Sequence, residues 1–187
     1  GYEPKKLFNS AGIPPTCYDD LKARLNGLEF QALIYAVQGE MNDIFLGFMR
    51  EPGKLGLERE QARARFQAST LGEAIRISTR FRETVRNDIS YIIEKNTAEH
   101  TVTLALDYQT IPGLDSDIFN WFHLVDIYRY YCWLIGRRIN LKSVSYSGPP
   151  PAKGDGSNIF ELFNCNIKFN QQVNSLSFSD TYLTQSL

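Results

Sequence analysis

Three side chains that could bind anions or transfer protons lie three residues apart in an otherwise apolar and aromatic stretch: His123, Asp126 and Arg129. On a helix, this spacing places them along one side. Because buried charges are costly without partners, one interpretation is a structural Asp126–Arg129 ion pair beside His123. In the other interpretation, Arg129 binds the carboxylate or hydroxyl groups of a small molecule through its two-pronged donor geometry.

The helix predicted at residues 118–136 carries aromatic side chains on nearly every face. Aromatic side chains bury large areas, and Tyr and Trp keep a polar group that needs a partner. The helix is therefore either a central core element or one that packs on a sheet and also lines a ligand pocket. A partly apolar small molecule would suit such a pocket, with an acid favoured if Arg129 is unpaired and a sugar also possible. The candidate ligand-binding residues are Trp121, His123, Asp126, Arg129, Tyr130 and Trp133.

Sequence signatures of enzymes are scarce in this chain. It contains no GxSxG, GxxxxGK[ST], GxGxxG or HExxH pattern. With two histidines a multi-histidine metal site is not expected, and a lone His123 is weak evidence for haem. We therefore expect no enzyme activity, no metal and no cofactor. The alternative is a small α+β enzyme that acts on an organic acid or sugar through His123, Asp126 and Arg129.

A capped helix followed by two strands is predicted between residues 70 and 108. Thr70 can cap the helix and Glu73 can reach back to it, as a capping box requires. One helical face then carries Leu71, Ala74, Ile75, Ser78, Phe81 and Val85. Beyond it the period drops to two, which predicts a hairpin in which Ile89, Tyr91 and Ile93 face Val102, Leu104, Leu106 and Tyr108.

A helical section is predicted over about residues 1–68. Asn26 with Glu29 forms a second capping box, which opens a helix. The middle of this helix, residues 32–37, is apolar on every side and is expected to be deeply buried. A short apolar helix is predicted at residues 44–49, and a mostly charged surface helix at residues 59–67.

The second section, about residues 69–187, is predicted to hold the sheet. After the hairpin and the helix at 118–136 come a strand at 139–146 and a Pro- and Gly-rich loop at 147–157. A short helix capped by Asn158 and two strands at 166–169 and 175–178 complete the chain. Because strands and helices do not alternate regularly, the predicted fold class is α+β with a mainly antiparallel sheet after a helical section. A single domain over residues 1–187 is expected.

Composition and charge are those of an ordinary globular domain. Of the 187 residues 43% are apolar, and no apolar run approaches the roughly 20 residues of a membrane span. The net charge is −1, whereas a nucleic-acid binder usually carries a basic excess, so no DNA contact is expected from this segment alone. Cys17, Cys132 and Cys165 form no disulfide framework, which favours buried thiols and a cytoplasmic location.

Several runs of the sequence resemble a known family. These are STLGEAIRISTRF at residues 69–81 with the hairpin and long helix after it, and FELFNCNIKFNQQVNSLSF at residues 160–178. The early GLEFQALIYAVQGEMNDIFLGF, at residues 27–48, fits the helical pair of the same family. Together they resemble the amino-terminal effector-binding ("arabinose-binding") domain of AraC/XylS-type bacterial transcription regulators.

This resemblance implies a ligand-sensing domain that binds a small organic effector. In the family a carboxy-terminal domain with two helix-turn-helix units reads DNA, and it is expected here after residue 187. The chain would then contact DNA only through that domain. It would either associate weakly with a second copy as a homodimer through the charged helices at 59–67 and 71–85, or stay monomeric with these helices solvated. The family offers no motif for ligand-binding residues, so none is transferred to this chain.

Overall fold

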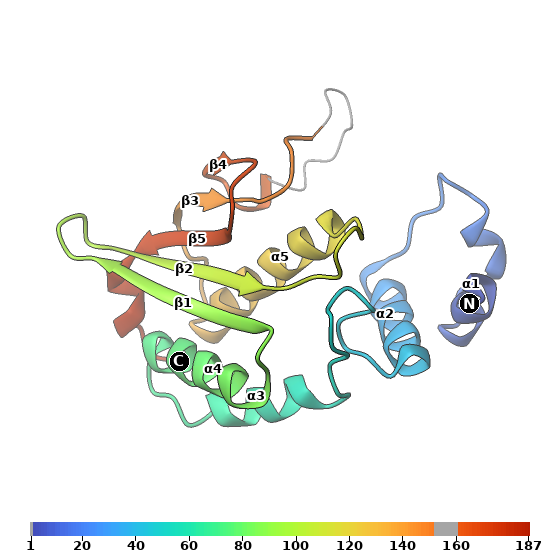
Figure 1. Ribbon diagram of the computed structural model, residues 1–187, viewed down its shortest axis with the longest axis horizontal. Coiled ribbons are helices and arrows are strands. Elements are labelled where there is room, and N and C mark those ends of the chain that lie inside the picture. Colours follow the sequence, from blue (N-terminus) through green and yellow to red (C-terminus); the bar gives the residue numbers. More distant parts are fainter. Residues whose placement is uncertain (1, 152–160) are drawn as a thin grey trace. The chain divides into compact units, whose positions relative to one another are not determined.

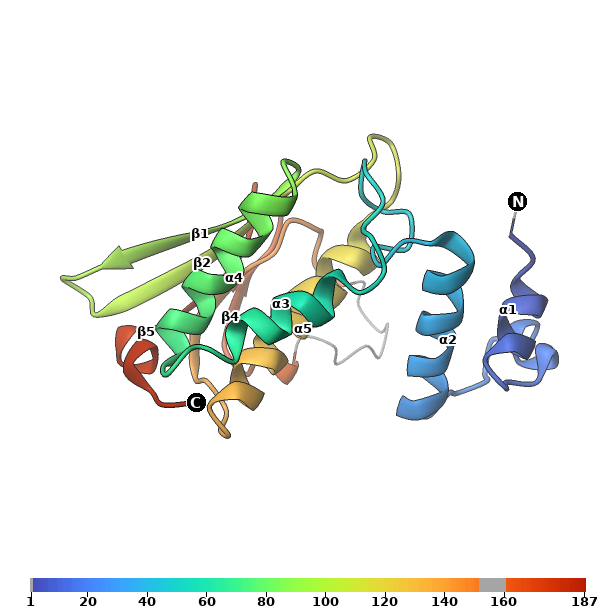
Figure 2. The same ribbon diagram turned by 90° about the horizontal axis from the view of Figure 1, so that it is seen from below.

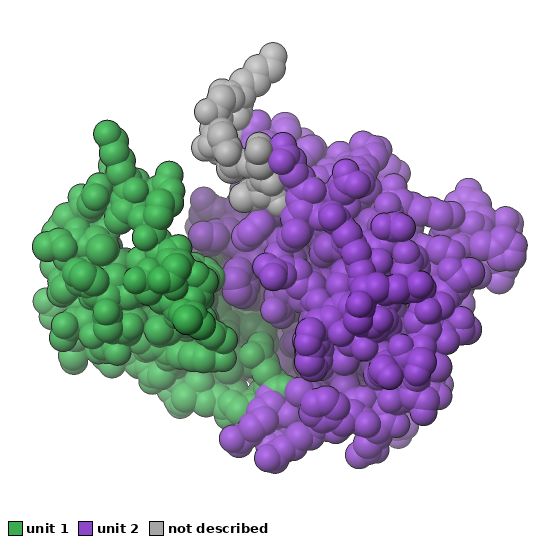
Figure 3. Space-filling view, turned by 180° about the vertical axis from the view of Figure 1, so that it is seen from behind, with its two compact units in different colours: residues 1–58 green, residues 59–187 purple. Residues whose placement is uncertain are grey.

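A computed structural model describes residues 2–151 and 161–187 of the chain. The chain divides into two compact units, Gly1–Glu58 and Arg59–Leu187, which Figure 3 shows in different colours. Their boundary lies close to the end of the predicted helical section. That residues 1–187 act as a single domain stays a prediction.

Unit 1 is helical, with α1 (Pro4–Ser10), the short 3-10 helix η1 (Pro15–Tyr18) and α2 (Gly27–Met41), all at the blue end of the ribbon in Figure 1. The predicted capping box of α2 is confirmed. Asn26 Oδ1 accepts hydrogen bonds from the Leu28 and Glu29 amides, and Glu29 Oε2 accepts one from the Asn26 amide at 2.8 Å. The helix ends at Asn42, which adopts a left-handed conformation with φ of 52°.

Two predictions for unit 1 are wrong. Residues 32–37 are not deeply buried, and no residue of α2 is, because within this unit α2 packs against the seven-residue α1, which covers only part of it. Residues 44–49 form turns instead of a helix. The buried carboxylate of Asp43 accepts hydrogen bonds from the amides of Phe45, Gly47 and Gly53, and this arrangement competes with a helix.

Unit 2 contains a five-stranded sheet with the order β1-β2-β5-β3-β4. Figure 1 shows the long β1–β2 hairpin at one edge of this sheet and the short β4 at the other. Neighbouring strands are antiparallel except β3 and β4, which are parallel. The predicted α+β class with a mainly antiparallel sheet is therefore confirmed. The strands are β1 (Ile89–Asn96), β2 (Thr101–Tyr108), β3 (Leu141–Ser145), β4 (Asn166–Lys168) and β5 (Asn174–Ser179).

The register of the hairpin agrees with the period-two prediction. Ile89 pairs with Tyr108, Tyr91 with Leu106 and Ile93 with Leu104, in the order that the sequence predicted. The row continues across the sheet, because Leu104 pairs with Leu176 and Leu176 pairs with Val144. These side chains face one side of the sheet, which α4 (Leu71–Val85) and α5 (Asp117–Leu134) contact.

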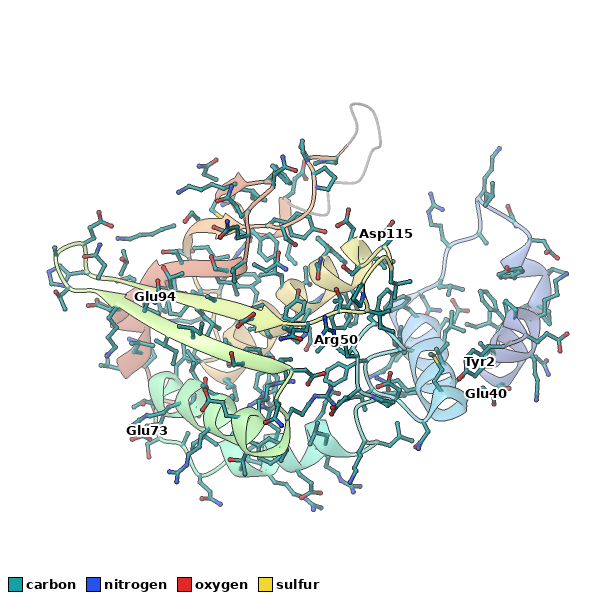
Figure 4. All side chains as sticks on the ribbon, in the orientation of Figure 1. Tyr2, Glu40, Arg50, Glu73, Glu94 and Asp115 are labelled. Atoms are coloured by element: carbon teal, nitrogen blue, oxygen red, sulfur yellow. The ribbon has the colours of Figure 1, made fainter. Side chains whose placement is uncertain are left out.

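The helix α4 starts as predicted but buries more than its apolar residues. Thr70 Oγ1 accepts a hydrogen bond from the Glu73 amide, whereas the Glu73 carboxylate accepts one from the Ser69 amide, one residue before the predicted partner. Figure 4 labels Glu73 at this end of the helix. Val85, which was predicted on the apolar face, is exposed, whereas Arg82 and Arg86, which lie outside that predicted face, are buried.

The remaining predicted elements are found with shifts of a few residues. The charged helix is α3 (Leu57–Arg65), and the aromatic helix is α5. In the turn before α5, Asp115, which Figure 4 labels, accepts a hydrogen bond from the Asp117 amide. The strands predicted at 166–169 and 175–178 are β4 and β5, but β5 lies between β2 and β3. The helix predicted to start at Asn158, and part of the loop at 147–157, lie outside the described residues.

The end of the chain is attached to the start of α4. The 3-10 helix η3 (Asp180–Thr184) packs on α4, and Ser186 forms a β-bridge with Thr70. The Leu71 amide donates to the Gln185 carbonyl at 3.0 Å, and the Leu187 amide donates to the Ser69 carbonyl. A Cβ atom on Gly72 would lie 2.9 Å from the Leu183 carbonyl oxygen, so this close approach requires glycine.

Candidate functional site

The predicted stripe of His123, Asp126 and Arg129 does not come together in one cluster. The His123 side chain is buried, whereas Asp126 and Arg129 are exposed on the same helix. No ion pair joins Asp126 to Arg129 among the described residues. Steps of three residues drift around a helix of 3.6 residues per turn, so the stripe runs from the core to the surface.

The other three predicted residues also lie in different surroundings. Trp121 is half-buried, and its indole N–H has no hydrogen-bond partner within the described ranges. Trp133 is 65% exposed, with its ring centroid 5.8 Å from that of Tyr130. Tyr130 is half-buried and lies under the Arg65 guanidinium, which is 4.3 Å from the ring centroid. The six predicted residues therefore do not line one common site.

His123 is enclosed by aromatic rings from the sheet and from its own helix. Its Nε2 lies 3.2 Å from the Tyr91 hydroxyl, and its ring stacks on Phe119 with centroids 5.6 Å apart. Tyr108 meets the ring edge-on. Loss of water around the ring lowers the His123 pKa to about 3, with a smaller contribution from the positive charge of Arg82. The imidazole is thus neutral at physiological pH and a weak base.

Arg65 enters the core of unit 2 from the end of α3. Its Nε donates to Ser78 Oγ at 2.6 Å, and Ser78 Oγ in turn donates to the Ala74 carbonyl. Gln61, also buried, donates to the Ser78 carbonyl at 3.2 Å. Figure 2 shows α3 beside α4 and α5, which agrees with these contacts. The guanidinium is therefore held between the Ser78 hydroxyl and the Tyr130 ring.

Arg82 is buried and forms no ion pair with another described residue. It is 6% exposed, and no hydrogen bond or ion pair joins its guanidinium to another described residue. The contact that it does make is with the face of the Tyr91 ring, whose centroid lies 4.9 Å from Cζ. One turn later Arg86 is equally buried but binds Asp88 through two hydrogen bonds. The difference between these two arginines indicates a special role for Arg82.

Tyr131 supplies a second donor without a partner. It is 2% exposed, and its hydroxyl makes no hydrogen bond within the described residues, although Ser78 is close enough to lower its pKa. Burial has the larger effect and raises the Tyr131 pKa, so the hydroxyl stays protonated. Arg82 contacts the Tyr91 ring and Arg65 contacts Ser78, and both arginines influence the pKa values of Tyr91 and Tyr131. We call Arg65, Ser78, Arg82, Tyr91, His123 and Tyr131 the arginine site.

Positive charge dominates the arginine site. His123 is neutral there, and the carboxyl influenced by both buried arginines is that of Asp126. Crowding by protein atoms removes water from part of that carboxyl and raises its pKa, and this outweighs the opposite effects of Arg82 and Arg65. Part of the Asp126 side chain still reaches solvent. Unpaired buried donors beside a net positive charge suit the binding of an anion or of several acceptor oxygens.

Sequence reasoning missed Arg65, Arg82 and Tyr131. It placed Arg65 in a charged surface helix, and it looked for a site around the polar residues of the aromatic helix. The sequence did contain a signal for the burial of Arg82. Ser78 and Arg82 follow Ala74 at four-residue steps, so all three lie on the buried side of α4. A polar residue that continues an apolar stripe is a candidate for a buried site. Arg65 carried no comparable signal, because α3 is charged on most sides.

Other kinds of site have little support within the described ranges. Cys17, Cys132 and Cys165 are free thiols, and they are half-buried instead of buried. Burial raises the pKa of the Cys165 thiol, which disfavours the reactive thiolate. No group of three or more metal-ligating side chains is found there, and no described helix is long and apolar enough to cross a membrane.

Comparison with known proteins gives the family. The sequence matches, over residues 1–187, the family described as the arabinose-binding domain of AraC transcription regulator, N-term. Among solved structures the fold resembles the transcriptional regulator CdpR from Pseudomonas aeruginosa, with a TM-score of 0.51 and 18% identity. The similarity covers 100% of this chain and 58% of that chain, and no curated protein matched. The chain therefore belongs to the family of amino-terminal arabinose-binding domains of AraC-type transcription regulators.

Proposed function

We propose that residues 1–187 form the sensor of a bacterial, cytoplasmic AraC-type regulator. The sensor binds a small organic effector and controls DNA binding by a helix-turn-helix domain that follows residue 187. The observation that carries this proposal is Arg82, a buried charge without a counter-ion, in a domain whose family is that of a regulator. A ligand that supplies the missing partner would bind one state of the domain better than another, as regulation requires.

The enzyme alternative has less support. His123, Asp126 and Arg129 would have to act together, yet one is buried and two are exposed. A general base works best with a pKa near the working pH, and the His123 pKa is lowered to about 3. We therefore propose that the domain is not an enzyme.

The effector signal would pass along α4 to the end of the chain. Ser78 and Arg82 lie on this helix, and its first residues bind Gln185 and Ser186. A shift of α4 on effector binding would therefore move or release the segment that leads to the DNA-binding domain. It would also change any contact between two copies through the exposed sides of α3 and α4, which is how we propose that a homodimer forms.

The test uses the full-length regulator and its promoter DNA. Compounds are first screened for those that raise the melting temperature of residues 1–187, and the DNA affinity of the full-length protein is then measured with each. We expect an effector to change that affinity by about 5- to 150-fold, and residues 1–187 alone, with a net charge of −1, to bind no DNA at physiological salt. A gene that encodes no helix-turn-helix domain after Leu187 would contradict the proposal.

Gly72→Ala is expected to weaken the coupling without removing the effector site. The added Cβ would meet the backbone oxygen of Leu183, so the tail has to move away from α4. The variant should bind effector with unchanged affinity, while the effect of the ligand on DNA binding falls. Gly39→Ala is the control, because its Cβ would meet nothing within 4 Å. A wild-type response in both variants would show that the contact between α4 and the tail does not transmit the signal.

A further inference from the structure

We infer that the effector is a small organic acid, and that its carboxylate binds the Arg82 guanidinium inside the arginine site. This inference rests on the proposed function, because it names the class of the effector. It differs from the sequence prediction, in which the exposed Arg129 was the residue to bind an acid.

The first support is the contrast among three buried arginines of unit 2. Arg86 is neutralised by Asp88, with side chains that are 6% and 10% exposed. Arg65 has a hydrogen bond to Ser78. Arg82 is as buried as these two and has neither kind of partner among the described residues. A buried charge without a paired anion is unfavourable, so a bound group of opposite charge would be stabilised at Arg82.

The second support is the number and type of the free donors. Within the arginine site, the fully buried donors without a partner are Arg82 Nε and the Tyr131 hydroxyl. A carboxylate could accept from Arg82 Nε, because a guanidinium binds such a group in a planar, two-pronged geometry. The Tyr131 hydroxyl, which lies beside Ser78, is a second donor available in the same site. A neutral sugar would satisfy the hydrogen bonds but would leave the Arg82 charge without a counter-ion.

The third support concerns the rest of the ligand. The Tyr130 ring lies against the Arg65 guanidinium and the Tyr91 ring against that of Arg82. Tyr91 and Tyr131 are each 2% exposed. Such surroundings favour an apolar or aromatic body next to the carboxylate. The neutral imidazole of His123 adds no competing charge at physiological pH.

The inference has a consequence for the free protein that can be measured without any ligand. Arg82→Met keeps the packing on Tyr91 and removes the unpaired charge, so its melting temperature should equal that of the wild type or exceed it by about 2–4 °C. Arg86→Met, the matched control, strips Asp88 of its partner and should melt roughly 6 °C or more below the wild type. A lower melting temperature for Arg82→Met would show a structural role and overturn the inference.

The ligand test uses thermal shift on residues 1–187 with four matched probes at constant ionic strength: benzoate, hexanoate, benzamide and hexanamide. We expect at least one acid to raise the melting temperature by several degrees while its amide does not, and Arg82→Met to lose that shift. Inorganic phosphate and L-arabinose are run beside them. Stabilisation by arabinose or phosphate but by neither acid would overturn the inference, as would equal shifts from acid and amide.

The same probes separate this inference from the proposed function. If DNA binding by the full-length regulator responds to a neutral compound and to no acid, the sensor proposal stands and the carboxylate inference fails. If an acid binds residues 1–187 through Arg82 but no ligand changes DNA binding, the carboxylate site stands and the sensor proposal fails.

Discussion

Replacing Asp43 by alanine is expected to destabilise unit 1 by about 3–5 kcal/mol, since a buried backbone amide without an acceptor costs about 1–3 kcal/mol. The Asp43 carboxylate is 3% exposed and accepts from three amides, at 2.9 Å from Phe45, 2.8 Å from Gly47 and 2.6 Å from Gly53. Alanine leaves these three donors without their acceptor. The measurement is urea unfolding followed by circular dichroism, together with amide hydrogen exchange at Gly47 and Gly53.

The control is Asp20→Ala, in the same unit. The Asp20 carboxylate also accepts a backbone hydrogen bond, from the Lys22 amide at 2.9 Å, but it does so at an exposed position where water can replace it. Its loss should change stability by no more than about 0.5 kcal/mol. Equal effects of the two substitutions would mean that the turn does not depend on the buried carboxylate.

Stability is expected to fall by about 2 kcal/mol between pH 7.5 and pH 5 because of His123, and by roughly 4 kcal/mol by pH 3. In the unfolded chain this histidine gains its proton around the ordinary pKa of 6.5, whereas in the fold its pKa is lowered to about 3. Between these values the unfolded state binds more protons, so the free energy of unfolding decreases as the pH falls. The contribution is fully present above pH 6.5.

His123→Gln isolates this contribution. Glutamine does not titrate, and its side chain can still share a hydrogen bond with the Tyr91 hydroxyl, so the pH dependence below 6.5 should become shallower. His100→Gln, at a side chain that is 80% exposed, should keep the slope of the wild type. The measurement is urea unfolding at pH values from 7.5 to 4.5, and parallel curves for wild type and His123→Gln would contradict the assigned burial.

The sequence by itself determined the elements whose signals are local. The hairpin register followed from alternation, since Tyr91 and Leu106 fall opposite one another once the turn between residues 96 and 101 is placed. The capping box of Asn26 and Glu29 and the Thr70 cap could also be predicted from the sequence. In each cap the side chain forms a hydrogen bond with an amide only two or three residues away, so the signal is local. The α+β class followed from the order of these elements, and the resemblance of residues 69–81 and 160–178 pointed to the family.

Only the tertiary structure decided which polar residues are buried together. Arg65, Arg82 and Tyr131 come from α3, α4 and α5, so their placement depends on how these three helices pack together. The same holds for β5, which lies between β2 and β3 instead of beside β4. Asp43 binds Gly53, ten residues away, and so replaces a helix that local apolar residues predicted. A contact between segments far apart in the sequence cannot be predicted from local periodicity, because each segment contains only one of the two residues that make the contact.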